Sequence, residues 1–365
     1  MRDEQLDIYR GLTMIWILCI LHVSCYFALF TNYIIDLIMF EMPVLFFISG
    51  AALTYTKDKP FKIQLKNRFK RIYLPFIIFC CLAIFVFGIL RLFNLHTYQL
   101  KNFGFYPPSW LRSKPIHFLL TPPSYLWFIP QYFLIAISFP LQKKLIINKL
   151  GGVKYFILIV AVSIVIYALH IPYHYINFLS MTFCYNCFFI AGYVFYRKLS
   201  NKLITGLFLI LAVIFTVLSI YKYDPFSLGS LMYGYKWQGH PYYLVFGFMC
   251  ICLFAILLIN VKIKKTKLIG LWSDLSFTIF LYQGFVFFVI GKLVYHWIDP
   301  ATLPVPQRIV AFLILSVIVL FLSTVTSKLF IKTEETIISV ATRLFSKIKI
   351  CKKHPLIENN GNKES

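Results

Sequence analysis

The chain has 365 residues, of which 60% are hydrophobic, 19% aromatic and only 13% charged. This composition excludes an ordinary soluble globular protein of that length. The formal net charge is +23, yet no basic block stands free of a hydrophobic segment. The charge therefore indicates loops that face anionic lipid headgroups, and it argues against nucleic-acid binding.

Long hydrophobic stretches follow one another along the whole chain. A helix needs about 20 mostly apolar residues to cross a bilayer. We therefore predict an all-α membrane protein, a polytopic bundle of about ten transmembrane helices. The stretches lie near 8–30, 33–55, 73–93, 124–142, 155–171, 175–196, 203–221, 242–260, 268–295 and 307–331.

Lysine and arginine are unevenly distributed among the loops between these stretches. They concentrate in the loops at 57–71, 143–154, 197–202 and 262–267, whereas the alternate loops are longer and nearly bare of positive charge. Because short cytoplasmic loops collect Lys and Arg, we predict that both termini lie in the cytoplasm. The first stretch lacks a short apolar region followed by a cleavage site, so we expect it to be retained as a span.

The first predicted span, LDIYRGLTMIWILCILHV, carries Asp7, Arg10 and His22 on an otherwise apolar segment. Ionisable groups at membrane depth are costly and therefore indicate function. Asp7 precedes Arg10 by three residues, so the two can pair on one helical face. The alternatives are that Asp7 and Arg10 only anchor the helix at the interface, and that His22 is a buried histidine bonded to a neighbouring helix.

The second predicted span contains an acid, Glu41, just before Pro43. Its carboxylate is a candidate to orient His22, as an acid orients a catalytic base. The equally open alternative is that Glu41 is the counter-ion of a Lys or Arg elsewhere in the bundle.

Two loops on the predicted outer side, near 94–123 and 222–241, are unusually long for a compact bundle. The second is rich in tyrosine and tryptophan beside hydrogen-bonding groups, and Tyr235, Trp237 and His240 are its candidate sugar-binding residues. An aromatic belt at the membrane interface is the alternative.

The segment after the last span predicts a separate helix. Thr333 is a candidate N-cap, and apolar residues follow at helical spacing. We expect one membrane domain over 1–332, an amphipathic cytoplasmic helix over 333–351 and a disordered polar tail over 352–365. No metal site is expected, because Pro172 interrupts the spacing of His170 and His174.

Five segments, taken in order, carry a recognisable pattern. They are LDIYRG followed by His22, MPVLFFISGAALTY, KNRFKRIYLPF, YLWFIPQYFLI and LSFTIFLYQG. In order and topology they resemble the integral-membrane acyltransferase-3 family, over about 330 residues. The resemblance implies a ten-span enzyme of the bacterial cell membrane. Such an enzyme moves a short acyl group, commonly acetyl, from cytoplasmic acyl-coenzyme A (acyl-CoA) to a surface carbohydrate or its lipid-linked precursor.

The resemblance also suggests roles for single residues. His22 would remove the proton of the acceptor hydroxyl, since imidazole has a pKa near 6.5. Arg10 lies about 18 Å from His22 along the helix, too far for the same reacting centre, so we expect it to bind donor phosphate. Acyl-CoA would be a substrate, with no tightly bound cofactor. The remaining candidates are Asp7, Arg68, Lys70 and Arg71 for the donor, and Trp127, Tyr235, Trp237, His240 and Gln283 for the acceptor.

Two departures from the family pattern bear on this site. The family usually has ten residues between its Arg and His, which leaves an offset of about 20° around a helix. Here eleven residues intervene, and the offset would be about 120°. We therefore predict a π-bulge within 11–21 that absorbs the extra residue. In the second departure, Gln283 stands near a position where many relatives have His, and an amide cannot exchange protons at neutral pH.

A carrier is the rival hypothesis. An exporter of a polysaccharide or a lipid-linked intermediate would share the spans and the aromatic outer loops, but it would need an open hydrophilic path and would tolerate the loss of His22. A structural membrane subunit fits poorly with Arg10, His22 and Glu41 at depth.

Overall fold

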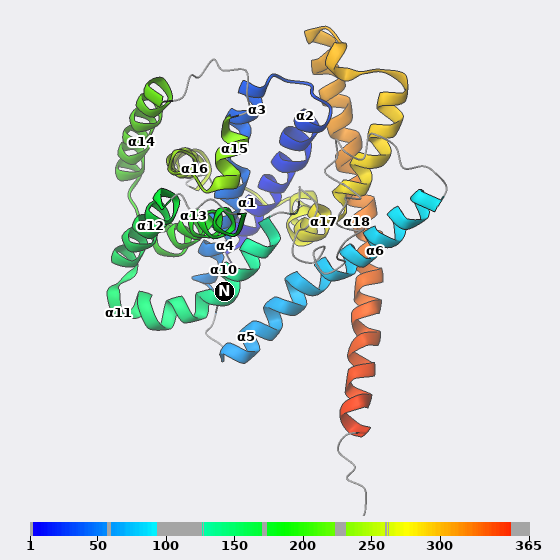
Figure 1. The fold of residues 1–365 in the computed structure, drawn as a ribbon, viewed down its shortest axis with the longest axis horizontal. Helices are drawn as coiled ribbons and strands as arrows, with labels where there is room; N and C mark the ends of the chain where they lie inside the picture. The colour runs from blue at the N-terminus through cyan, green and yellow to red at the C-terminus, as the bar shows by residue number, and fades with distance from the viewer. Residues whose placement is uncertain are drawn as a thin grey trace, which may run out of the picture.

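The computed structural model describes residues 3–56, 60–92, 126, 128–169, 174–222, 231–259, 261 and 263–351. All regular secondary structure in these ranges is helical (Figure 1). Among the described residues, seven helices are long and apolar enough to cross a membrane, and two further apolar helices are shorter. The predicted all-α, multi-pass membrane fold is thus confirmed. Where the structure describes them, the ten predicted stretches are largely helical, while the count of ten spans and their orientation stay predictions.

The described part of the chain forms a series of helices, several of which pack against partners far away in the sequence. They are α1 (Glu4–Ile15), η1 (Trp16–His22), α2 (Val23–Tyr26), α3 (Asn32–Ile38), α4 (Glu41–Leu53), α5 (Phe61–Arg68), η2 (Phe69–Tyr73), α6 (Leu74–Leu92), α10 (Phe128–Gln142), η4 (Lys143–Ile147), α11 (Asn148–Leu150), α12 (Gly152–Ala168), α13 (His174–Phe195), α14 (Asn201–Lys222), α15 (Leu231–Gln238), α16 (Pro241–Phe254), η5 (Ala255–Ile259), α17 (Lys267–Trp297), η6 (Pro300–Thr302) and α18 (Val305–Cys351).

The first span, Glu4–Tyr26, contains the predicted irregularity. Residues Trp16–His22 form a π-helix, η1, between α1 and α2. The face of η1 that carries Cys19 lies against α18, and the Ser316 hydroxyl of α18 donates to the Cys19 carbonyl at 2.8 Å. That bond ties the π-helix to a neighbouring helix through its backbone. The predicted π-bulge is confirmed, centred slightly closer to His22 than expected.

The second span is broken in the middle. Helix α3 ends at Ile38, and α4 begins at Glu41. The break sets Glu41 in the first turn of α4, where a carboxylate is favoured by the helix dipole.

Helices α4 and α13 cross closely at two glycines, and this crossing explains the FFISG motif. A side-chain carbon added at Gly50 would overlap the Phe189 carbonyl, and one added at Gly192 would overlap the Phe47 carbonyl. Helices in lipid associate through such small residues, since apolar burial does not distinguish a neighbouring helix from lipid. The motif therefore fixes how α4 and α13 cross.

The last helix differs from the prediction. Helix α18 runs without interruption from Val305 to Cys351 and continues, orange to red, well past the rest of the bundle (Figure 1). Thr333 is not an N-cap, because its hydroxyl donates back to the Leu329 carbonyl at 3.3 Å. The helix does not begin anew at Thr333, and Glu334, which is buried and accepts from the Tyr282 hydroxyl at 2.9 Å, ties α18 to α17 there. The division into a membrane domain and a cytoplasmic helix stays a prediction. The tail over 352–365 lies outside the described residues.

Of the two long loops near 94–123 and 222–241, the structure describes only part of the second. Residues 94–123 and Trp127 lie outside the described part of the chain. The second loop contains a short helix, α15, which packs against α3, α13 and α16. It is therefore partly built into the bundle.

Candidate functional site

A buried carboxylate joins two cations at the end of the first span that the sequence places in the cytoplasm. Asp7 Oδ1 lies 3.5 Å from Arg10 Nη1, so the predicted pairing of the two residues is present. Asp7 Oδ2 lies 3.9 Å from the Nζ of Lys265. Lys265 belongs to the segment between η5 and α17, and the sequence prediction assigned it only to the topology of the loops.

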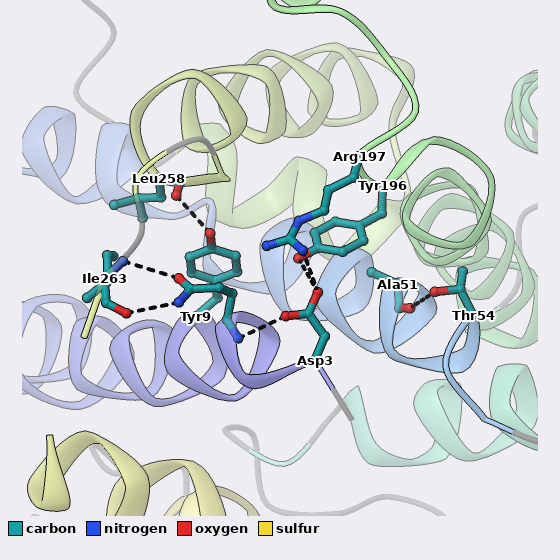
Figure 2. Close-up of polar contacts among 9 residues, drawn as sticks. Asp3, Tyr9, Ala51, Thr54, Tyr196, Arg197, Leu258 and Ile263 are labelled. Carbon is teal, nitrogen blue, oxygen red and sulfur yellow. Dashed lines mark hydrogen bonds and ion pairs between the residues drawn. The ribbon is translucent and has the colours of Figure 1, made fainter. Parts of the chain in front are cut away.

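The start of α1 is tied to its surroundings on both sides (Figure 2). Asp3 caps α1 by accepting from the Gln5 backbone N–H at 2.9 Å. From the end of α13, the Tyr196 hydroxyl and the Arg197 Nη1 each lie 3.1 Å from Asp3 Oδ2. Burial and the Asp3 carboxylate raise the pKa of Tyr196, which keeps the phenol protonated as a donor.

On the other side, α1 holds the segment that follows η5. The Tyr9 hydroxyl donates to the Leu258 carbonyl at 2.8 Å. The Gln5 amide donates to the Ile263 carbonyl at 2.9 Å and accepts from the Ile263 N–H at 3.3 Å. Figure 2 draws the bond from Tyr9 to Leu258 and the two bonds at Ile263 as dashed lines. They fix the backbone two residues before Lys265.

The basic cluster predicted for the donor lies on α5 and η2. Arg68 is half-buried, whereas Lys70 and Arg71 are exposed. Helix α5 packs beside α10, and it continues through η2 into α6 as one oblique rod (Figure 1). Lys70 and Arg71 are thus presented on the surface.

His22, at the end of η1, is bonded to α17. Its Nδ1 lies 2.7 Å from the side-chain oxygen of Gln283. The Gln283 amide nitrogen in turn donates to the Phe280 carbonyl at 3.1 Å. Gln283 is buried, while His22 is half-buried. The structure therefore joins His22 to Gln283, which the sequence placed with the acceptor-binding residues.

This arrangement selects one tautomer of the neutral imidazole. The Gln283 nitrogen is used toward Phe280, so its oxygen faces His22, and an amide oxygen only accepts hydrogen bonds. The Nδ1 of His22 must then carry the hydrogen, which leaves Nε2 as the basic nitrogen. A histidine in this form can accept a proton at Nε2 while Gln283 stabilises the N–H at Nδ1.

Aromatic rings surround the imidazole. Tyr26, Phe280 and Phe287 approach it edge-on, with ring centroids at 5.6, 6.0 and 6.1 Å. Phe128 of α10 packs edge-on against Phe280 at 4.8 Å. This apolar wall limits the orientations open to His22.

Glu41 forms its ion pair with Lys236 of α15. Both side chains are almost fully buried, with 1% of Glu41 and 7% of Lys236 exposed. The other carboxylate oxygen of Glu41 has no hydrogen-bond partner among the described residues. The prediction that Glu41 orients His22 is not supported, because Gln283 occupies that position at Nδ1, and the counter-ion alternative describes its contact.

The acceptor candidates of the second loop pack among themselves. His240 caps α16 by accepting from the Tyr242 N–H at 2.9 Å. Its ring lies 4.5 Å from the rings of both Tyr235 and Tyr167. His240 is buried and Tyr235 half-buried. The side chains of Trp127 and Trp237 lie outside the described part of the structure.

A family model described as an acyltransferase domain matches residues 3–328, nearly the whole chain. The chain belongs to the acyltransferase-3 family. No curated protein and no solved structure matches it. The predicted family resemblance is confirmed, and the protein is a membrane acyltransferase.

In this acyltransferase-3 family member, two lysines contact buried acidic residues although the sequence did not single them out as site residues. Lys265 and Lys236 stand far from their acidic partners in the chain, and each has a simpler explanation as a loop charge. One signal was present for Lys236, which is one of few positive residues in the predicted outer loops. The described residues contain no group of three or more His, Cys, Asp or Glu side chains that could hold a metal ion.

Proposed function

We propose that this acyltransferase moves a short acyl group, acetyl in the simplest case, from acyl-CoA to a hydroxyl of a surface polysaccharide or a lipid-linked glycan precursor in the bacterial cell membrane. The observation that carries the proposal is the hydrogen bond from His22 Nδ1 to Gln283. It leaves Nε2 as a base of the kind that acyl transfer to a hydroxyl requires.

The chemistry follows from that nitrogen. Nε2 takes the proton of the acceptor hydroxyl while the hydroxyl oxygen attacks the thioester carbonyl, and a new C–O bond forms. The C–S bond then breaks, and the proton held by His22 goes to the leaving thiolate of coenzyme A. Gln283 stabilises the imidazolium through Nδ1 during both steps, so we assign it to positioning His22.

Donor binding is proposed at the opposite end of the same span. Arg10 is partly exposed beside the buried Asp7, and its planar guanidinium suits the binding of phosphate. Arg10 and His22 are about 18 Å apart along the helix, and the long pantetheine arm would cover this separation. With one residue absorbed by η1, the angular offset returns from about 120° to about 20°, which aims both side chains toward one side. Arg68, Lys70 and Arg71 would attract the anionic donor.

The acceptor is proposed to approach from the predicted outer side, where α15 and the start of α16 lie. Tyr235 is half-buried there, and Trp127, Trp237 and His240 remain candidates for stacking or hydrogen bonding to sugar rings. Because His240 is packed between two tyrosines, its role would be to shape the surface.

A glycan carrier is the second candidate, and one observation favours it. The second span is broken beside the buried Glu41–Lys236 pair, and discontinuous helices with buried charges occur at transporter sites. The two functions differ in their dependence on His22.

The test compares cells that carry wild-type protein or His22→Ala at matched membrane abundance. Mass spectrometry of surface and lipid-linked glycans should show that the variant loses one acyl mass while export continues. Unchanged acylation with normal export would refute His22 as the base. Failed export of an unmodified glycan would favour the carrier.

A further inference from the structure

We infer that Lys265 is a second phosphate-binding cation for the donor, acting together with Arg10. The inference rests on the proposed function and extends its donor site to the segment that precedes α17. Arg10 Nη1 lies 3.5 Å from one carboxylate oxygen of the buried Asp7, and Lys265 Nζ lies 3.9 Å from the other.

These contacts leave both cations with binding capacity. Charge-assisted N–H···O bonds are usually about 2.7–2.9 Å long, so neither cation is held tightly by Asp7. The side chain of Arg10 is 27% exposed and that of Lys265 is 29% exposed, against 6% for Asp7. The three formal charges sum to one net positive charge at a partly open site, which favours an anion.

Lys265 is held in position by its backbone and by its stem. Two hydrogen bonds between Gln5 and Ile263 fix the preceding backbone. A side-chain carbon added at Gly270 would lie 3.0 Å from Lys265 Cε, which places the stem against the first turn of α17. A carbon added at Gly11 would lie 2.8 Å from the Ile269 carbonyl oxygen, so α1 and α17 cross closely just past Arg10.

The chemistry of the two cations is complementary. Arginine binds phosphate through two parallel N–H groups, whereas lysine provides a compact point charge. One phosphate group of coenzyme A placed between them could accept from both, with Asp7 retained behind as the group that orients them. The donor site would then join α1 to the start of α17, the helix that also carries Gln283.

The experiment measures coenzyme A binding to purified protein in detergent, by the ligand-induced rise in melting temperature. Lys265→Ala should weaken binding about tenfold, the size expected for loss of one charge-assisted hydrogen bond. Lys264→Ala is the matched control, since Lys264 is the exposed neighbour and its loss should leave binding unchanged. Lys265→Arg should retain most of the affinity, and phosphate-free pantetheine should bind wild type and Lys265→Ala equally.

The outcomes separate the two proposals. If wild type binds coenzyme A and Lys265→Ala binds it equally well, the inference is overturned while the donor proposal stands. An equal loss in Lys264→Ala would also overturn it, because general loop charge would then explain the effect. If wild type fails to bind coenzyme A, the donor proposal and this inference both fail. If Lys265→Ala without ligand has a lower melting temperature than wild type, the binding of coenzyme A is measured with Lys265→Gln instead.

Discussion

A single amide decides which nitrogen of His22 is basic. Gln283→Leu removes the acceptor at Nδ1 and lets the ring rotate or change tautomer. We expect kcat to fall at least about tenfold, part of the 10²–10⁴-fold that a positioned base supplies. The KM for acyl-CoA should stay unchanged, because Arg10 lies about 18 Å away. Steady-state kinetics in proteoliposomes measures both, and a change in KM alone would contradict the role of Gln283.

Asp3 combines a helix cap with an ion pair, and two substitutions separate them. Asparagine caps a helix as well as aspartate does, whereas alanine does not. Asp3→Asn therefore keeps the cap but loses the Oδ2 that pairs with Arg197, whose side chain is 43% exposed, and that accepts from the Tyr196 hydroxyl. Asp3→Ala should lose about 1 kcal/mol more of unfolding free energy. Thermal unfolding in detergent compares them, and equal melting temperatures would show that the cap contributes nothing.

Sequence reasoning at the residue scale succeeded where partners are local. Asp7 and Arg10 are one helical turn apart, so their pairing follows from helix geometry. The bonds from Asp7 to Lys265 and from His22 to Gln283 join residues far apart in the chain. Only the tertiary crossing of α1 with α17 brings these side chains together.

At the scale of the element, η1 is expected to compensate for one extra residue. Deletion of Ile20 should turn η1 into regular α-helix and leave Arg10 and His22 aligned, so activity should largely survive. Deletion of Leu12 in α1 should cost far more, because it rotates the residues between the deletion and η1 by about 100°. Acyl transfer by both deletion variants at equal abundance is the measurement. Loss of activity in the Ile20 deletion alone would contradict this role of η1.

The Glu41–Lys236 pair fastens α15 to the broken second span. Glu41→Gln or Lys236→Met alone removes one charge of the buried pair, and the charge mismatch that remains costs about 3–5 kcal/mol. The double variant removes both charges and should recover most of that loss. Lys202→Met, at an exposed lysine, is the control and should have little effect. Melting curves in detergent test this, and additive losses in the double variant would show that the pair is uncoupled.

Helices were the most predictable elements, because apolar runs of sufficient length leave few alternatives in a membrane. The irregularity of the first span was also predictable, since it came from counting residues between Arg10 and His22. The break before Glu41 and the continuity of α18 through Thr333 were not. Both depend on contacts with other helices, including the Tyr282 bond to Glu334, which the local sequence does not encode.

At the scale of the whole molecule, the even number of predicted spans has a direct consequence. A green fluorescent protein fused after Ser365 should fluoresce, because the C-terminus is predicted to be cytoplasmic. Alkaline phosphatase inserted within 223–230 should be active, because that loop is predicted to face outward. The same enzyme inserted within 57–59 should be inactive. The reverse pattern at either loop would contradict the predicted orientation.

The most direct measurement of the central claim follows an isotope-labelled acyl group in proteoliposomes that contain the purified protein, labelled acyl-CoA and lipid-linked glycan. Wild type should move the label to the glycan and release free coenzyme A in equal amount. His22→Ala should bind coenzyme A as wild type does and transfer no label. Label transfer by His22→Ala at the wild-type rate would contradict the claim that His22 is the base of this acyltransferase.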